Sequence, residues 1–96
     1  MDDKLELINR RERQILVHSC IYYIYNDNII SDDTWMEWAK ELEDLIRGYP
    51  EEFKRSVLYD RFRDFDHSTG FNLEMKDPWT MSRAYLLLLN KYDGVM

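Results

Sequence analysis

The sequence predicts a small, single-domain, all-α protein over residues 1–96. Its 96 residues suffice for one domain and leave no room for a second of ordinary size. Hydrophobic residues make up 45% of the chain beside only three glycines and two prolines, which is typical of a packed domain and not of a disordered segment. Helix signals recur along the chain, and we expect a bundle of about four helices.

The first predicted helix runs from about Lys4 to Asn26. Its second half, ILVHSCIYYIY (residues 15–25), is almost wholly apolar, which indicates a central, buried helix. Asp27 and Asn28 follow it and favour a turn.

The second predicted helix has the strongest periodic signal. Ser31 is its expected N-cap, and Asp32 and Asp33 suit the positive end of the helix dipole. Gly48 is expected at the position after the last helical residue. Apolar residues at i, i+3, i+4, i+7, i+10 and i+11 predict one buried stripe: Trp35, Trp38, Ala39, Leu42, Leu45 and Ile46.

Two further helices are expected in the second half of the chain. Pro50 opens the third, which carries the apolar residues Phe53, Val57, Leu58 and Phe62. A loop is predicted over 64–70. Asp77 as N-cap and Pro78 at the first helical position begin the fourth helix, which ends at Gly94. Between the loop and this helix, residues 71–75 could form a short extended stretch.

The charge distribution bears on the choice of partner. Thirteen basic and nineteen acidic residues give 13 − 19 = −6, and this acidity argues against binding to a nucleic acid backbone. Residues 31–52 hold eight of the acids against two bases and so carry the whole net charge. A solvated helix face is the usual explanation of such a run. Alternatively, Glu37, Glu41 and Asp44 could bind a protein partner with a basic surface.

Other features narrow the class of protein. The single cysteine, Cys20, cannot form an internal disulfide, and the longest apolar runs, 20–25 and 84–89, are far shorter than the ~20 residues of a membrane span. With no basic and apolar leader at the N-terminus, we expect a cytoplasmic protein without membrane contact. His18 and Cys20 point away from each other on a helix, so no metal site is predicted.

Residues 18–50, HSCIYYIYNDNIISDDTWMEWAKELEDLIRGYP, resemble the small N-terminal domain of bacterial NAD⁺-dependent DNA ligases. That family has an aromatic helix of the type H-x-Y-x-Y-(H/Y), a short loop to I-(S/P)-D-x-x-Y-D, and an amphipathic Glu/Leu-rich helix that ends before a proline. The similarity covers about residues 8–53 without a gap, whereas 54–96 have no counterpart in it. It implies a helical domain that closes over the nicotinamide mononucleotide (NMN) half of NAD⁺ and performs no chemistry alone.

The resemblance also implies site residues. Tyr22 matches a family tyrosine at the nicotinamide, and Asp32 matches an acid near the ribose. Tyr23 stands where the ligases usually have histidine, Trp35 where they have tyrosine, and Met36 where they have a second acid. The implied NMN or NAD⁺ pocket is therefore more apolar than in the family, and the loss of a polar group there costs ~1–3 kcal/mol of ligand binding.

Lys91 begins the sequence KYDG, which has the K-x-D-G form of the ligase motif whose lysine becomes adenylated. In the ligases this motif lies against a large nucleotide-binding domain, for which a chain of this length has no room. We therefore expect Lys91 to be a cation in the last turn of a helix and the protein to be no enzyme.

These observations favour three functions. The leading hypothesis is a non-catalytic interaction protein of phage or mobile-element type, acting in the cytoplasm of a bacterial host, for example as an inhibitor of a DNA-processing or CRISPR-type defence enzyme. The alternative is a module that binds NMN or NAD⁺ through Tyr22, Tyr23, Asp32 and Trp35. The third is a modulator that docks onto a ligase nucleotidyltransferase domain.

Overall fold

The computed structural model describes residues 3–65 and 73–93, and within these two stretches the protein is helical with no strand. The predicted all-α fold is thus confirmed. Of the extended stretch expected at 71–75, residues 71 and 72 lie outside the described part, and 73–75 are irregular. The helices are α1 (Asp3–Tyr23), α2 (Asp32–Gly48), α3 (Pro50–Lys54), α4 (Tyr59–Phe62) and α5 (Pro78–Asp93).

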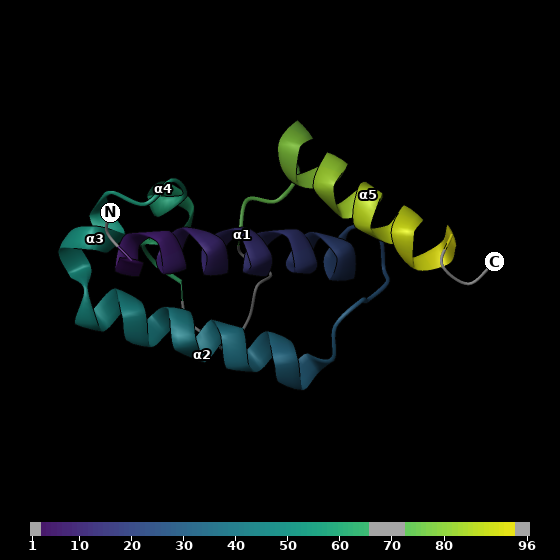
Figure 1. Ribbon diagram of the computed structural model, residues 1–96. Helices are drawn as coiled ribbons and strands as arrows, with labels where there is room; N and C mark the ends of the chain where they lie inside the picture. Colours follow the sequence, from purple (N-terminus) through teal and green to yellow (C-terminus); the bar gives the residue numbers. More distant parts are fainter. Residues whose placement is uncertain (1–2, 66–72, 94–96) are drawn as a thin grey trace.

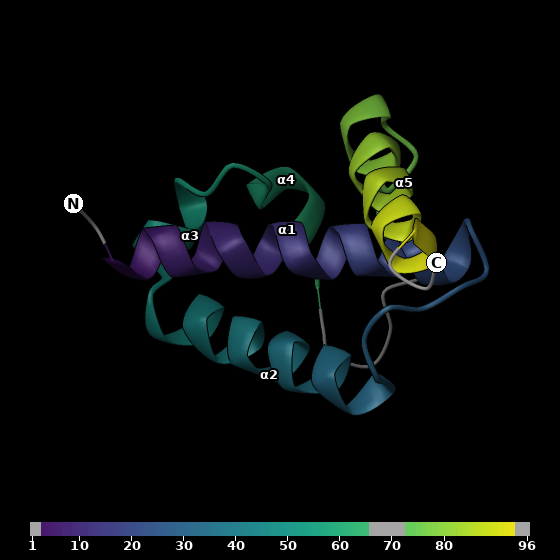
Figure 2. The same ribbon diagram turned by 45° about the vertical axis from the view of Figure 1, so that its right-hand side comes forward.

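Helix α1 is the centre of the fold, as expected from its apolar second half. In Figure 1, α2 runs antiparallel to α1 along one side, whereas α5 crosses the C-terminal half of α1 on another side. Figure 2 shows the same arrangement after a turn of 45°. Covered on several sides, α1 supplies much of the core: Ile8, Ile15, Leu16, Val17, Cys20 and Ile21.

Helix α1 ends at Tyr23, three residues earlier than the sequence indicates. Asn26 has a φ of 55°, in the left-handed region that asparagine tolerates better than most residues. The backbone N–H of Asp27 then donates to the carbonyl of Ile21 at 3.1 Å. This turn ends α1 and begins the connection to α2.

Helix α2 begins as predicted. The backbone N–H of Thr34 donates to the Ser31 hydroxyl at 3.1 Å, which confirms Ser31 as the N-cap. The predicted apolar stripe belongs to the core and its rim, with Leu42 fully buried. The expectation for Gly48 is wrong, because Gly48 is itself the last helical residue and its φ is not positive. The next residue, Tyr49, closes the helix by donating its N–H to the Leu45 carbonyl at 2.8 Å.

The single third helix expected from Pro50 to Phe62 is wrong. The chain forms two short helices, α3 and α4, and the residues between them are a turn. Phe53 and Phe62 are buried and Leu58 is half-buried, but Val57 lies on the outside of the turn with 62% of its surface exposed. Val57 is therefore no core residue.

Polar side chains of α1 cause this break. The side chain of Asn9 accepts a hydrogen bond from the Val57 N–H at 2.9 Å, and the carboxylate of Glu12 accepts one from the Leu58 N–H at 3.3 Å. Glu12 also accepts from the Ser56 hydroxyl at 2.8 Å. Backbone N–H groups that a continuous helix would use internally are thus bound by α1 instead.

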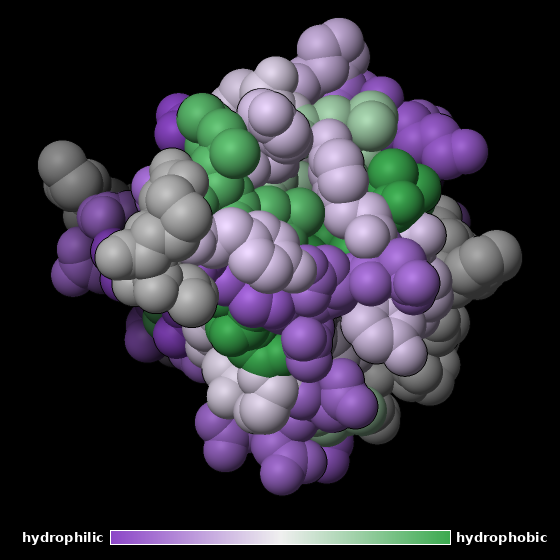
Figure 3. Space-filling view, turned by 90° about the vertical axis from the view of Figure 1, so that its right-hand side faces the viewer, coloured by the Kyte–Doolittle hydropathy of each residue, from purple (hydrophilic) through white to green (hydrophobic). Residues whose placement is uncertain are grey.

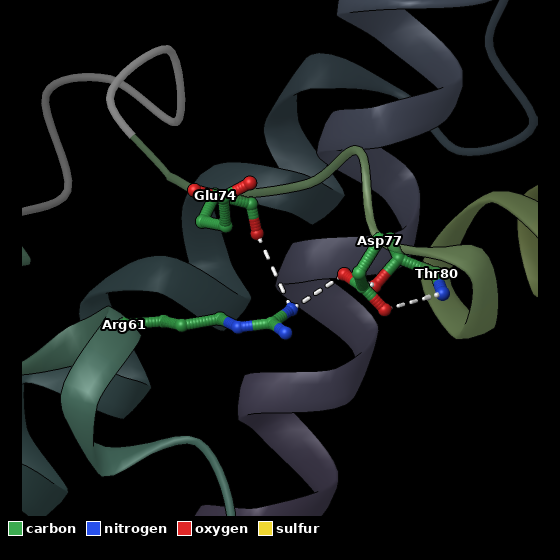
Figure 4. Close-up of polar contacts among 4 residues, drawn as sticks. All are labelled: Arg61, Glu74, Asp77 and Thr80. Carbon is green, nitrogen blue, oxygen red and sulfur yellow. Dashed lines mark hydrogen bonds and ion pairs between the residues drawn. The ribbon is translucent and has the colours of Figure 1, made fainter.

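Helix α5 begins at the predicted cap. The carboxylate of Asp77 accepts from the Thr80 backbone N–H at 3.1 Å and from the Thr80 hydroxyl at 2.6 Å. Arg61 of α4 reaches the same carboxylate at 2.6 Å and the Glu74 carbonyl at 3.4 Å, as Figure 4 shows. Partial burial acts to raise the pKa of Asp77, but the hydrogen bonds from Thr80 and Arg61 outweigh it and lower that pKa to about 2. One side chain therefore caps α5 and ties it to α4.

Candidate ligand pocket and acidic face

A cavity of about 290 Å³ lies where the end of α1 meets the start of α2. The connection between the two helices contributes residues 28–31 to its wall. Helix α1 contributes His18, Ser19, Tyr22 and Tyr23, and α2 contributes Asp32, Trp35 and Met36. The four residues predicted to bind a cofactor, Tyr22, Tyr23, Asp32 and Trp35, all line this one cavity.

Two tyrosines form the outer rim of the pocket. Tyr22 and Tyr23 are both exposed, and their rings meet edge to face with centroids 4.9 Å apart. Both also border a second cavity of about 400 Å³ beside Asn26 and Asp27. Their phenol rings therefore present aromatic surface that a planar ligand could contact.

The inner wall of the pocket is held by contacts between α1 and α2. The indole N–H of Trp35 donates to the Ser19 hydroxyl at 3.2 Å, which fixes the Trp35 ring against α1. On the same side of α1, the His18 ring lies 5.5 Å from the Trp38 ring, measured between centroids. Trp35 is thus held in place by a hydrogen bond between the two helices.

His18 carries an unsatisfied polar atom. Its Nδ1 is buried and has no hydrogen-bond partner among residues 3–65 and 73–93. Burial lowers the pKa of His18 below its usual value, so the imidazole is neutral at pH 7. A neutral imidazole has one donor and one acceptor nitrogen, and a buried polar atom of this kind normally has a partner. His18 thus lines the pocket and also has a buried nitrogen without a hydrogen-bond partner among the described residues.

The charge that lines the described pocket is negative. Asp32 is exposed at its rim, and neither lysine nor arginine lines it within the described part of the chain. The wall offers aromatic rings, one carboxylate and hydroxyl groups. Such a wall suits a neutral or cationic planar group better than a phosphate.

The predicted acidic face on α2 is only partly free. Glu37 and Asp44 are exposed on the outside of the helix. Glu41 instead forms an ion pair with Arg11 of α1, with 3.0 Å between Oε2 and Nε. Arg11 also donates to the Gln14 side chain at 2.6 Å. Glu41 thus contributes to the contact between α1 and α2, while the other two carboxylates face solvent.

Lys91, from the ligase-like KYDG sequence, has a structural contact. Its ammonium group donates to the Asp27 carboxylate at 2.8 Å and to the Asn28 carbonyl at 2.6 Å. The Tyr92 hydroxyl donates to the same carboxylate. Hydrogen bonds from Lys91 and Tyr92 lower the pKa of Asp27 to about 2. The end of α5 is thereby fastened to the connection that forms the pocket wall.

Glu12 is a buried ionisable group on α1 that was not predicted from the sequence. It is fully buried on α1, and burial raises its pKa to about 7 against the hydrogen bonds from Ser56 and Leu58. A signal for it exists in the sequence, because Glu12 lies four residues after Ile8 and four before Leu16 on the apolar side of the helix.

The thiol of Cys20 is not suited to nucleophilic catalysis. Cys20 is buried, and burial raises the pKa of its thiol, which disfavours the reactive thiolate.

The two stretches that the structure describes contain no group of three side chains suited to hold a metal ion. They also contain no helix long and apolar enough to cross a bilayer.

Comparison with known proteins finds no matching family model, no similar curated protein and no similar solved structure. The resemblance to the ligase small domain therefore stays a prediction from residues 18–50.

Proposed function

We propose that this protein is a non-catalytic binding module whose pocket between α1 and α2 takes the nicotinamide part of NMN or NAD⁺. One observation carries the proposal. The four residues that the ligase resemblance implies for this ligand line a single cavity, and His18, whose buried Nδ1 has no hydrogen-bond partner among the described residues, lines it too.

The size of the pocket favours a small ligand. Its volume of about 290 Å³ lies at the lower end of the ~300–1,000 Å³ of typical small-molecule sites. A nicotinamide ring with its ribose suits this volume, whereas a whole dinucleotide would leave its adenosine half outside. The proposal therefore places the recognition in the nicotinamide half.

The chemistry of the wall favours the same part of the molecule. The oxidised nicotinamide ring of NMN carries a positive charge, which Asp32 and the faces of aromatic rings stabilise. Its carboxamide has N–H donors, and the imidazole of His18, which lines the same wall, has an acceptor nitrogen when it is neutral. Because no cation lines the described pocket, the phosphate of NMN would extend into solvent.

No catalytic step belongs to the proposal. Lys91, the counterpart of the adenylated lysine in the K-x-D-G motif, is bound to Asp27 and Asn28. Cys20 is buried with its thiol disfavoured as a nucleophile. The protein is accordingly proposed to recognise the ligand without transforming it.

Calorimetric titration with NMN, nicotinamide riboside and NAD⁺ tests the proposal. We expect binding that Tyr22→Ala and Asp32→Asn abolish, and nicotinamide riboside should bind about as tightly as NMN. Asp33→Asn is the matched control, because Asp33 shares the first turn of α2 but does not line the pocket. At a ligand concentration 100 times the Kd, the protein should gain about 2.7 kcal/mol of stability. Absence of heat and of thermal shift with all three compounds at millimolar concentration would refute the proposal.

A protein partner with a basic surface is the second candidate, favoured by the exposed Glu37 and Asp44 on α2. A phage-type inhibitor of a host DNA-processing enzyme, or a protein that docks onto a ligase nucleotidyltransferase domain, would both use such a face. The isolated nucleotidyltransferase domain of a bacterial NAD⁺-dependent ligase is a suitable probe.

The expected result is a salt-sensitive complex that alters adenylation of that domain and is weakened by Glu37→Lys with Asp44→Lys. Asp64→Lys with Glu74→Lys, at two exposed acids outside α2, is the control with a matching charge change. Equal binding by the double variant and by the control would reject a role for the acidic face.

A further inference from the structure

Helix α5 exposes an unusual amount of apolar surface. Its inner side packs on α1 through the buried Ala84 and Leu88. On its outer side, large apolar residues between 39% and 54% exposed form what we term the α5 apolar face: Trp79, Tyr85, Leu86, Leu89 and Tyr92. Isolated exposed residues of this kind are common, but a continuous group on one helix indicates a contact surface.

The helical spacing makes the face continuous. Tyr85, Leu86, Leu89 and Tyr92 stand at i, i+1, i+4 and i+7, and therefore follow one side of the helix. Figure 3 looks at the molecule from the side where α5 ends, and apolar side chains gather in its upper half, over α5. Hydrophilic side chains occupy most of the lower half.

We propose that the α5 apolar face binds a second copy of this chain, so that the protein forms a weak symmetric dimer. This inference is independent of the ligand pocket and of the acidic face. It concerns the part of the chain, residues 54–96, that has no counterpart in the ligase resemblance.

Charge is the first argument for a second copy. Residues 78–92 of α5 include no acid, and their cations are Arg83 and Lys91, of which Lys91 is paired with Asp27. A basic partner would find no acid to bind within this stretch. An anionic membrane would be repelled by the net charge of −6. Two copies, in contrast, can join with little repulsion, because the acidic α2 lies along a different side of α1 (Figure 1).

The second argument is the symmetry of the face. A two-fold axis between Leu86 and Leu89 would set Leu86 of each copy opposite Leu89 of the other in an antiparallel helix pair. The pattern on α5 is thus compatible with its own copy.

The third argument is the area. A buried aromatic side chain covers 150–250 Å², so three of them about half exposed and two leucines offer on the order of 500 Å² per copy. The pair would bury roughly 1,000 Å², which is close to the smallest area expected of a specific interface. We therefore expect a dissociation constant in the micromolar range or weaker.

Sedimentation equilibrium over a wide range of protein concentration tests the proposal. The mass should rise from 11.8 kDa toward 23.6 kDa (2 × 11.8) as the concentration increases. Leu86→Glu with Leu89→Glu should keep the mass at that of the monomer. Leu87→Glu is a control with one added charge, because Leu87 is exposed on the same helix outside the defined face and should leave the association unchanged.

A second measurement uses the unaltered chain and so does not depend on how the variants fold. Dilution should shift the amide NMR signals of residues around Leu86 and Leu89 and leave those of α2 unchanged. High salt should preserve the dimer, in contrast to association through the acidic face. A mass of 11.8 kDa at every concentration would overturn the proposal. So would a monomer that floats with neutral phosphatidylcholine vesicles and loses this property in the double glutamate variant.

Discussion

The carboxylate of Glu12 on α1 accepts a 2.8 Å hydrogen bond from the hydroxyl of Ser56, although Glu12 is fully buried. Ser56 lies in the turn between α3 and α4, so this contact joins the central helix to the segment where the predicted long helix is interrupted. Burial raises the pKa of Glu12 to about 7. Neutralising a buried acid in this way avoids much of the cost of an unpaired charge.

This relationship predicts a pH dependence of folding. The pKa of Glu12 is about 7 in the folded protein against 4.5 as its usual value, so the folded state retains a proton that the unfolded state releases. Its stabilising effect is complete below pH 4.5 and is lost as the pH rises through 7. We expect the unfolding free energy to fall by up to about 1.4 kcal/mol per pH unit within that window.

Glu12→Gln should remove most of this slope, because glutamine resembles the protonated acid and keeps partners for Ser56 and Leu58. Urea titrations of both proteins between pH 4.5 and pH 8 would measure it. At pH 8 the variant should be the more stable of the two. Parallel pH profiles for the two proteins would show that Glu12 has an ordinary pKa.

Phe62 and Val57 should differ sharply in their effects on stability. Phe62 is fully buried, so Phe62→Ala should cost about 3–5 kcal/mol through lost contacts and a cavity. Val57→Ala should change stability by no more than about 0.5 kcal/mol, because Val57 is exposed on the turn. Chemical denaturation checks both values. A large loss from Val57→Ala would instead support the continuous helix from Pro50.

Asp77 should contribute to the stability of the fold, both as the cap of α5 and as the ion-pair partner of Arg61. Asp77→Ala should lower stability by about 1 kcal/mol or more at pH 7. Asp77→Ser should restore part of it, because a serine hydroxyl can still accept from the Thr80 N–H. The folded pKa of about 2 lies below the usual 3.8, so this contribution is present above pH 3.8 and is lost as the pH falls through 2.

Thermal unfolding at several pH values would test this behaviour. The difference between the original protein and Asp77→Ala should narrow below pH 3.8. A difference that does not change with pH would argue against an ionised cap.

Gly48→Ala should stabilise the protein. Gly48 is helical and exposed, its φ is not positive, and a Cβ added there would meet nothing within 4 Å. Alanine avoids the entropy that glycine loses in a helix, so we expect a gain of about 0.5–1 kcal/mol. The melting temperature would report it. A loss of stability would indicate a left-handed Gly48 in solution, as the sequence pattern first suggested.

The sequence was sufficient for the elements whose signals are local. The caps at Ser31 and Asp77 and the apolar stripe of α2 follow from short-range chemistry, and the structure confirms them. The sequence was insufficient where a side chain far away along the chain forms the deciding hydrogen bond. The break after Lys54 depends on Asn9 and Glu12, more than forty residues earlier, and no local propensity at residues 55–58 reveals it.

The candidate site likewise contains residues that the sequence predicted and features that depend on contacts between distant residues. Tyr22, Tyr23, Asp32 and Trp35 were predicted through the resemblance, and they line one cavity because the turn after α1 folds α2 back along it. That the described residues offer no partner to His18 Nδ1 could not be predicted, since it depends on how tightly neighbouring side chains close around the imidazole. Glu41 was predicted to bind a protein partner. Its ion pair with Arg11 could not be predicted, because it requires the antiparallel packing of the two helices.

The bond between Lys91 and Asp27 joins positions 64 residues apart. Helices α1 and α2 are neighbours along the chain, so their pairing encloses only a short loop and should form early during folding. Docking of α5 must close a much longer loop, and we expect it to be the late step. In this order the α5 side of α1 would stay uncovered until the last step, in which α5 completes the core and fastens the wall of the pocket.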